Sequence, residues 1–432
     1  MELSFIVSDV LARRSATFTP SRKQNDCRLP NITSMQQKRK IFNDPLYGLV
    51  RFTFDSIYTI IDHPYFQRLR RIRQLGLSSY VYTGATHSRF HHALGVAHLA
   101  DRLVNNLKHK DVEITDDEHE GVVLAALMHD IGHGPFSHVL EHGFLDQSHE
   151  QISLEIMELL NIELGGKLDT AIAIFTKEYP KPFLHQMIAS QLDVDRLDYL
   201  NRDSYYTGVV EGKVGFDRII TMMNVHEGRL VIEDKGLYSV EKFILARRYM
   251  YMQVYLHKVV ILLDEMLKSF LKRYQEVYLN DPKVDNRLLK LLRLPKKGAN
   301  ERKEVLKSYL LLDDIDIFAV LKDERRSADD ILSYLSTSIL DRELFSIIIE
   351  EKEISSDLVD EIRHKVAVKL DLTFDQTNHF VKSGNVQNLT YGSLEEIEIL
   401  KKTKSVVPIS HMLNTLNINS MERTFYVCFP RI

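Results

Sequence analysis

The distribution of histidines constrains this chain more than any other feature. Eleven of its eighteen histidines lie between residues 87 and 149, and His129 is followed directly by Asp130. An imidazole and a carboxylate at adjacent positions can share a divalent metal ion when more ligands come from elsewhere in the chain. His92 and Asp195 are the candidates for these further ligands. The fold must then bring three separate segments to one point.

Length and composition set the broad class. At 432 residues the chain is expected to form two or three cooperating units. A net charge of -4 argues against a general nucleic-acid binder, so no nucleic-acid partner is expected. Two cysteines, Cys27 and Cys428, exclude a disulfide framework and favour a reducing, cytoplasmic location. No apolar run approaches the roughly 20 residues that cross a bilayer, so no membrane partner is expected.

Composition also divides the chain into three parts. Residues 1–35 are polar with little periodicity, which predicts a tail that is disordered or foreign to the natural protein, with Met35 as a candidate start. Residues 36–273 are patterned for helices and form the expected catalytic core. Residues 274–432 contain loop and strand signals and predict a smaller α+β region. The expected fold class is mainly α, a helical core with an α+β C-terminal region.

Periodicity predicts individual elements. One helix is expected to open near Phe90 and to continue through 101–107, and a second is expected to break after Ile131, where two glycines and a proline follow. One long helix is expected over 240–270, which contains neither glycine nor proline. Alternation and β-forming residues predict strands over 396–400 and 424–429.

The candidate metal ligands have mixed chemistry. Two imidazoles and two carboxylates leave water positions open on an octahedral ion and suit manganese, iron, zinc, nickel or magnesium. Taken singly, each residue has a simpler interpretation: a surface or capping pair for His129 and Asp130, and a helix-end histidine for His92. Asp195 could belong to a solvated acidic face together with Asp193 and Asp198. Their joint order, with a glycine-rich break after the His-Asp pair, indicates a metal-dependent hydrolase.

Several longer motifs accompany this set. They are KIFNDP at 40–45, QRLR at 67–70, QLG at 74–76, RFHH at 89–92, the run at 129–138, DVDRLDY at 193–199, RD at 202–203 and YLHK at 255–258. With them the chain resembles the HD-domain phosphohydrolases, and more narrowly the deoxynucleoside triphosphate triphosphohydrolases, which include the SAM-and-HD-domain enzymes and their bacterial relatives. The resemblance covers slightly more than half of the chain, shows no SAM domain, and is loose after residue 273.

The resemblance implies a role for each matching residue. One divalent metal ion would be held by His92, His129, Asp130 and Asp195. Catalytic positions are matched by His133, His138, Glu141 and His149, where Glu141 replaces the family's aspartate and is one methylene longer. Substrate contacts are matched by Arg89, Gln74, Tyr199, Asp203, Arg247, Tyr255 and Lys258. Two alternatives stay open: Arg89 forming an ion pair at its helix start, and the tyrosines serving the core.

A second nucleotide site is also implied by the resemblance. The family's activator pocket, which lies between subunits, is matched by Lys40, Asn43, Asp62, Gln67 and Arg70. The competing interpretation is that the arginines of 68–73 form a solvated basic helix face. With an activator pocket, the expected partners are a nucleotide activator and further copies of the chain in a homodimer or homotetramer.

The implied reaction is hydrolysis of a deoxynucleoside triphosphate to a deoxynucleoside and inorganic triphosphate. Two alternatives remain. One is another HD-type phosphohydrolase, either a nucleoside monophosphatase or a cyclic-nucleotide phosphodiesterase. The other is a catalytically silent regulator that binds nucleotides.

Overall fold

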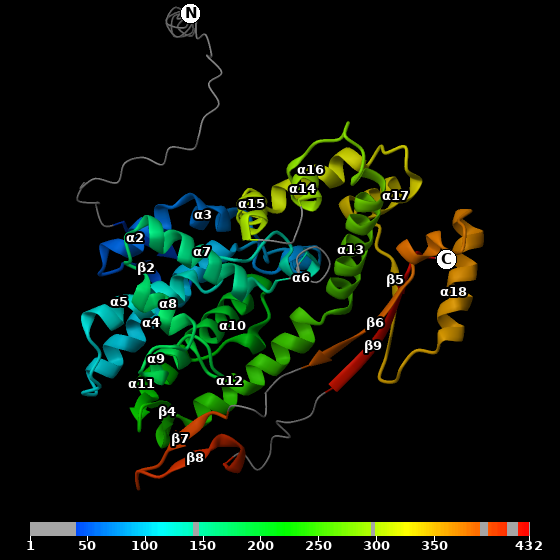
Figure 1. Ribbon diagram of the computed structural model, residues 1–432. Coiled ribbons are helices and arrows are strands. Elements are labelled where there is room, and N and C mark those ends of the chain that lie inside the picture. Colours follow the sequence, from blue (N-terminus) through cyan, green and yellow to red (C-terminus); the bar gives the residue numbers. More distant parts are fainter. Residues whose placement is uncertain (1–39, 141–146, 295–298, 389–395, 413–421, 432) are drawn as a thin grey trace, which may run out of the picture. The chain divides into compact units, whose positions relative to one another are not determined.

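Helices dominate the part of the chain that the structure describes. The structure is a computed structural model that describes residues 40–140, 147–294, 299–388, 396–412 and 422–431 (Figure 1). The predicted tail over 1–35 lies outside these ranges. The mainly helical fold class is confirmed, with small sheets in the C-terminal region.

The first part of the described chain is almost entirely helical. Its elements are β1 (Phe42–Asp44), β2 (Gly48–Val50), α2 (Asp55–Asp62), α3 (Pro64–Gln67), α4 (Arg89–Lys108), α5 (Asp116–Met128), α6 (Ser137–Leu140), α7 (His149–Glu163), α8 (Asp169–Phe175), α9 (Pro182–Gln186), α10 (Val194–Thr207), α11 (Phe216–Met222), β3 (Met223–His226), β4 (Arg229–Glu233), α12 (Leu237–Met250) and α13 (Lys258–Tyr278).

The C-terminal part mixes helices and strands, as predicted. Its elements are α14 (Arg287–Arg293), α15 (Ala299–Tyr309), α16 (Asp314–Glu324), α17 (Asp330–Leu340), β5 (Ser346–Glu350), α18 (Ser356–Leu370), β6 (Lys382–Asn388), β7 (Glu398–Leu400), β8 (Val406–Pro408) and β9 (Glu422–Phe429). The two predicted strands correspond to β7 and β9. The predicted boundary after residue 273 falls within α13, and this two-part division stays a prediction.

The sheets join segments that are far apart in sequence. β5, β9 and β6 form an antiparallel sheet in which Ile348 pairs with Val427. A second sheet has the order β3-β4-β7-β8, and its β4–β7 pair is parallel, with Ile232 opposite Ile399. A single apolar cluster contains buried residues from both parts, Val50 and Val427 among them. The C-terminal region therefore packs as part of the same core.

The helices that carry the predicted ligands have strong capping signals. Thr115 and Glu118 form a capping box at the start of α5, with Oγ1 accepting from the Glu118 N–H at 3.2 Å. The Asp193 carboxylate accepts from the Arg196 N–H at 2.7 Å and so caps α10. α10 is followed directly by Gly208, whose φ of +78° lies in the left-handed region that glycine favours. The Asp193 cap fixes the start of α10, where Asp195 lies, and the other caps set the opposite ends of α5 and α10.

The prediction of a single helix over 240–270 is wrong. α12 ends at Met250, a π-helical turn spans Tyr251–Tyr255, and α13 starts afresh at Lys258 after His257, whose backbone is extended with ψ of 130°. The Tyr82 hydroxyl donates to the carbonyl oxygen of Gln253 within the turn. This tertiary contact competes with regular helix geometry at a place where the sequence has no helix breaker. Figure 1 labels α12 and α13 as separate helices.

Among the described residues, none of the helices combines the length and apolar composition that crossing a bilayer requires.

Candidate active site

Two imidazoles and two carboxylates meet where α4, α5 and α10 begin or end. Nε2 of His92 lies 3.0 Å from an oxygen of Asp195 and 3.7 Å from one of Asp130. Nε2 of His129 lies 3.5 Å from Asp195 and 3.4 Å from Asp130. The structure thus brings the four predicted ligands together. We refer to these residues as the metal cluster.

Hydrogen bonds orient both imidazoles toward the centre of the metal cluster. Nδ1 of His92 lies 2.8 Å from a carboxylate oxygen of Asp198, and Nδ1 of His129 lies 2.7 Å from the carbonyl oxygen of Ala126. Because the carbonyl oxygen can only accept, the His129 proton sits on Nδ1, which leaves a lone pair on Nε2. The carboxylate favours the same tautomer for His92. Such partners hold a metal-binding histidine in its ligating form.

The protonation states of the imidazoles and carboxylates in the metal cluster depend on one another. Burial by itself lowers the pKa of His92, but the hydrogen bonds that its ring donates to Asp195 and Asp198 raise the pKa to about 10. Burial raises the pKa of Asp195, but hydrogen bonds with the two imidazoles hold it below its usual range. The carboxylates therefore stay ionised and favour positive charge between them. A metal ion that binds here must displace imidazole protons.

The donor set fits a divalent metal ion. Adjacent ligand atoms on an octahedral ion, each bound at about 2.1 Å, lie about 3.0 Å apart and somewhat farther on a distorted one. The nitrogen–oxygen separations of 3.0 to 3.7 Å in the metal cluster match this requirement. Mixed nitrogen and oxygen ligands also agree with the metals that the sequence predicts.

Asp198 is fully buried and supports the metal cluster through its hydrogen bond with the His92 imidazole. Both of its oxygens bind Arg202 at 2.9 Å, and the Tyr47 hydroxyl donates to it at 2.7 Å. Gly95 of α4 makes room for this pair, because a Cβ there would lie 2.0 Å from an Asp198 oxygen. Asp198 is therefore not part of a solvated face, the alternative that the sequence allowed for this group of aspartates.

We expect Asp198→Asn to weaken metal binding by about 10- to 100-fold, because the amide is a poorer acceptor for the His92 imidazole. Calorimetric metal titration of the folded variant measures the effect. Asp203→Asn, the same change at another buried position of α10, is the matched control and should bind metal as the wild type does. Equal metal affinity in all three proteins would show that Asp198 does not orient His92.

The loop after the His-Asp pair is held by a buried arginine. Arg68 is 1% exposed, and its guanidinium donates to the carbonyl oxygens of Ile131 at 3.2 Å and His133 at 2.8 Å. It also donates to the carbonyl oxygen of Leu312, which follows α15, at 3.1 Å. The interpretation of 68–73 as a solvated basic face is therefore wrong for Arg68.

Tyr309 of α15 holds the same loop from the C-terminal region. Its hydroxyl donates to the carbonyl oxygen of Gly132 at 2.9 Å, and its side chain is almost completely buried. A Cβ on Gly134 would lie 2.4 Å from this hydroxyl, so the approach requires glycine. The glycine-rich break predicted from sequence thus admits a contact from a distant segment.

A cavity of about 700 Å³ lies beside the metal cluster. Such a volume is typical of small-molecule sites. The predicted residues that line it are Gln74, Arg89, His92, Asp130, His133, His149, Asp195, Tyr199, Asp203, Arg247 and Tyr255. Among the described residues, His129 and Lys258 are not part of its lining. The side chain of His138, on α6, and the whole of Glu141 lie outside the described part of the chain.

The predicted phosphate and proton-transfer residues make specific contacts. Arg89 donates to an oxygen of Asp130 at 2.6 Å, so it forms an ion pair and still faces the cavity. The rings of His133 and His149 stack with centroids 3.8 Å apart. Nε2 of His149 lies 3.3 Å from an oxygen of Glu150. An acid is therefore adjacent to the histidine pair.

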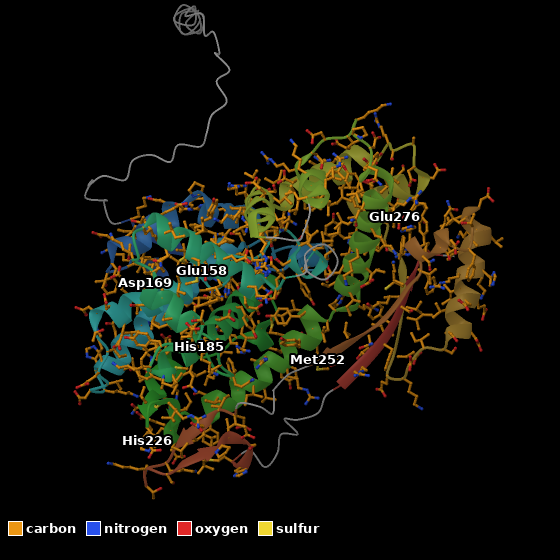
Figure 2. All side chains as sticks on the ribbon, viewed as in Figure 1. Glu158, Asp169, His185, His226, Met252 and Glu276 are labelled. Atoms are coloured by element: carbon orange, nitrogen blue, oxygen red, sulfur yellow. The ribbon has the colours of Figure 1, made fainter. Side chains whose placement is uncertain are left out.

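Several cavity residues were not singled out as site residues from sequence. They include Arg73, Arg196, Tyr251, Asp264 and Tyr426. Arg196 follows the ligand Asp195 directly, a signal that was available. Tyr251 belongs to the π-helical turn, beside exposed Met252 (Figure 2), and no sequence signal marks that turn. Tyr426 comes from β9, in a region where the sequence indicated no chemistry.

The residues predicted for an activator pocket form two pairs. Lys40 bonds to both oxygens of Asp62, and both side chains are partly exposed. Nε of Arg70 donates to the amide oxygen of Gln67 at 2.8 Å. Asn43 lies in β1 opposite Leu49. Their binding of a nucleotide stays a prediction.

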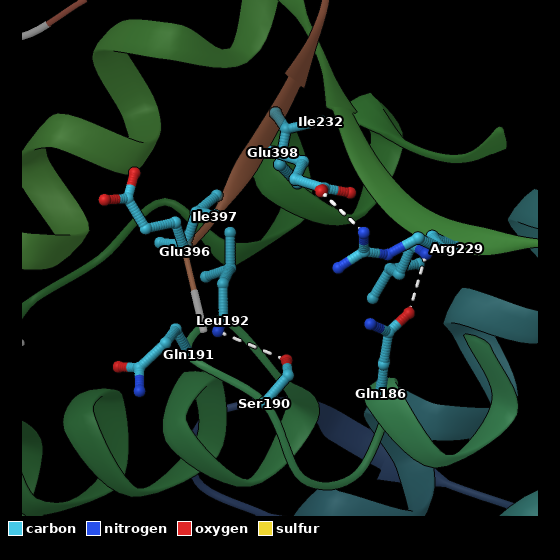
Figure 3. A pocket seen from close by; sticks show the side chains of 10 residues that line it. Gln186, Ser190, Gln191, Leu192, Arg229, Ile232, Glu396, Ile397 and Glu398 are labelled. Carbon is cyan, nitrogen blue, oxygen red and sulfur yellow. Dashed lines mark hydrogen bonds and ion pairs between the residues drawn. The ribbon is translucent and has the colours of Figure 1, made fainter. Parts of the chain in front are cut away.

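A second hollow is too small to hold a nucleotide. It has a volume of about 50 Å³ and lies where β4 meets β7 (Figure 3). Arg229 forms an ion pair with Glu398 at 3.1 Å across this junction. Gln191, on its rim, accepts a hydrogen bond from cavity-lining Arg247 at 3.1 Å. This hollow is a packing junction that also supports one wall of the main cavity.

Asp264, which lines the main cavity, has a raised pKa that predicts a pH-dependent stability. Burial, with a smaller contribution from the charge of Glu265, raises the Asp264 pKa to about 7. In the unfolded chain the Asp264 carboxyl ionises at about pH 3.9. The free energy of unfolding therefore falls as the pH rises from there to about 7. Asp264→Asn removes this loss. We expect the variant to gain roughly 2 kcal/mol more over wild type at pH 8 than at pH 5.

Urea unfolding at the two pH values measures this difference. Asp323→Asn, on the exposed side of α16, is the control for the substitution itself. A gain from Asp264→Asn that is the same at pH 5 and pH 8 would contradict the prediction.

The comparisons with known proteins agree with this geometry. The HD domain family matches residues 89–203, and the HD associated region matches residues 214–374. The crystal structure of a phosphohydrolase, BT4208 from Bacteroides thetaiotaomicron, is 41% identical, with a TM-score of 0.86 over 91% of this chain and 100% of that chain. An uncharacterized protein of Bacillus subtilis, YwfO, is 34% identical over 72% of both chains.

A relative with a named activity is more distant. The deoxynucleoside triphosphate triphosphohydrolase SAMHD1 homolog of Dictyostelium discoideum is 33% identical over 55% of this chain, and the match spans 50% of that protein. The protein belongs to the HD-domain phosphohydrolases. More particularly, it combines the HD domain with an HD-associated region.

Proposed function

We propose that the protein hydrolyses deoxynucleoside triphosphates to deoxynucleoside and inorganic triphosphate. The observation that carries this proposal is a cavity of about 700 Å³ that the metal cluster borders and that two chemically different sets of side chains line. We assign Arg73, Arg89, Arg196 and Arg247 to the phosphates and call this set the phosphate end. We assign Gln74, Tyr199, Asp203 and Tyr255 to the sugar and base and call this set the sugar end.

The phosphate end consists of four guanidinium groups, a type of group that can donate parallel hydrogen bonds to phosphate oxygens. Two of them are also paired with carboxylates, Arg89 with Asp130 and Arg196 with Asp193. Lys258, also predicted to contact phosphate, is not part of the described lining. A chain of three phosphates fits this number of guanidinium groups better than a monophosphate or cyclic nucleotide does.

The reaction requires one proton transfer to the leaving group. An oxygen of water bonds to the α-phosphorus, the bond from phosphorus to the 5′-oxygen breaks, and that oxygen accepts a proton. Glu150 lies beside His149, and a neighbouring carboxylate favours the charged imidazole that acts as an acid. We assign the proton to the group of His133, His138 and His149. A divalent metal ion bound by the metal cluster supplies polarisation of a phosphate oxygen and activation of water.

A nucleotide activator and self-association belong to the same proposal. The pairs Lys40–Asp62 and Gln67–Arg70 offer a cation, an acid and an amide on partly exposed side chains. These groups suit a triphosphate and a base edge. Homodimers or homotetramers would complete such a pocket.

Product analysis of the metal-reconstituted full chain tests the proposal. The four deoxynucleoside triphosphates are supplied singly and mixed, and ion-exchange chromatography separates the products. We expect deoxynucleoside and inorganic triphosphate, with neither formed by Asp195→Asn. Turnover only in mixtures would support the activator pocket.

Other products would refute this function. Release of a single phosphate or a nucleoside monophosphate would place the protein with the monophosphatases or cyclic-nucleotide phosphodiesterases. Tight nucleotide binding without turnover would favour a regulator.

A further inference from the structure

His87, a residue without an assigned role, connects the parts of the sugar end. It is 2% exposed, and its Nε2 lies 2.7 Å from one carboxylate oxygen of Asp203. The Tyr255 hydroxyl donates to the other oxygen at 2.8 Å. The side chain of Asp203 is 2% exposed yet forms part of the cavity lining. One buried carboxylate is therefore held between an imidazole and a phenol.

The surroundings of His87 fix both the plane and the proton of its ring. The ring stacks on Tyr206, with centroids 4.5 Å apart and planes 15° apart. Within the described part of the chain, its buried Nδ1 has no hydrogen-bond partner. A proton on Nδ1 would be buried unpaired, so the neutral ring carries its proton on Nε2. His87 therefore donates to Asp203.

The backbone of His87 holds a second residue of the sugar end. Its carbonyl oxygen accepts from the Gln74 N–H at 3.0 Å. Arg73 and Ser88 form an isolated β-bridge beside this bond, so the two segments lie side by side. His87 thus contacts Gln74 through its backbone and Asp203 through its side chain.

We propose that His87 is a positioning residue that presets the Asp203 carboxylate, and with it the Tyr255 hydroxyl, to receive a pentose hydroxyl of the bound nucleotide. This inference rests on the proposed function because it takes the ligand to be a nucleotide. A preset acceptor loses less entropy when the ligand binds than a mobile one does. The benefit should be confined to ligands that carry the hydroxyl.

Two variants separate the donor from the ring. His87→Phe keeps an aromatic ring against Tyr206 but removes the hydrogen bond to Asp203. His87→Gln keeps an N–H at a similar distance from the backbone but loses the ring. The probes are dATP, its 2′,3′-dideoxy analogue, which lacks the 3′-hydroxyl, and inorganic triphosphate. KM, kcat and the inhibition constant of inorganic triphosphate are measured on metal-reconstituted full chain, with calorimetric binding as the readout that needs no turnover.

We expect His87→Phe to raise the KM for dATP about tenfold, as befits the loss of one buried hydrogen bond. The KM for the dideoxy analogue and the inhibition constant of inorganic triphosphate should stay near wild type. His87→Gln should keep the KM for dATP within about threefold. Thermal unfolding of both variants confirms that they are folded.

Three results would overturn the assignment. One is an unchanged preference for dATP over its dideoxy analogue in His87→Phe. Another is equal weakening of all three ligands in both variants, which would indicate a purely structural role. The third is a wild type that binds no nucleotide, which refutes the proposed function as well. Binding whose 3′-hydroxyl preference disappears in His87→Phe, without turnover by the wild type, refutes hydrolysis alone.

Discussion

Replacing His129 by alanine is expected to lower phosphoester hydrolysis by at least about 10³-fold and to reduce bound metal. Its Nε2 faces two carboxylates of the metal cluster, and a metal ion contributes several kcal/mol to stabilising charge in such a transition state. Alanine also removes the bond to the Ala126 carbonyl, but it leaves α5 otherwise intact. Turnover and elemental metal content after dialysis measure the two losses.

His109→Ala is a suitable control for this change. His109 is exposed at the end of α4, far in sequence from the His-Asp pair, and its variant should keep full activity and metal. Full hydrolysis by a metal-free His129→Ala protein would contradict the role of the metal cluster.

The second large effect is on stability. Arg202→Met is expected to lower the free energy of unfolding by about 3–5 kcal/mol, because it leaves buried carboxylates without their cation. The Arg202 side chain is completely buried and binds Asp198 through two nitrogens at 2.9 Å and Asp44 at 2.8 Å. Urea denaturation followed by circular dichroism measures the loss.

Arg102→Met tests whether replacing another arginine of the helical core lowers the free energy of unfolding by the same amount. Arg102 also pairs with an aspartate, Asp217, at 2.6 Å, but the two side chains are 37% and 69% exposed. Exposed pairs contribute about 0–1 kcal/mol. Equal losses in the two variants would mean that burial of the Arg202 pair has no energetic consequence.

Much of the metal cluster could be predicted because its signals are local. His129 and Asp130 are adjacent, and the N-terminal caps of α5 and α10 are formed by short motifs around Thr115 and Asp193. Helical periodicity correctly predicted α4, which carries His92. For these elements, neighbouring residues determine the backbone, so the sequence can be interpreted without knowing the tertiary contacts.

The remaining features depend on contacts between distant residues. The turn between α12 and α13 coincides with a hydrogen bond from Tyr82, and no residue near Gln253 in the sequence predicts this turn. From sequence alone Arg68 is indistinguishable from a surface arginine, because its hydrogen-bond partner, the Leu312 carbonyl oxygen, is distant in sequence. His87 lacks a motif of its own, because its partner Asp203 lies far along the chain, in α10. Periodicity and motifs carry no information about such pairs.

The contact of α15 with the loop after the His-Asp pair limits which substitutions this family can accept. Tyr309 reaches the Gly132 carbonyl across 177 positions of sequence, outside the segment that the HD domain family matches. Substitutions in α15 can therefore alter the geometry of the metal cluster without touching any ligand. A chimera that exchanged residues 89–203 with those of a relative would need to exchange α15 as well. Over evolutionary time, the loop and its distant support are expected to change together.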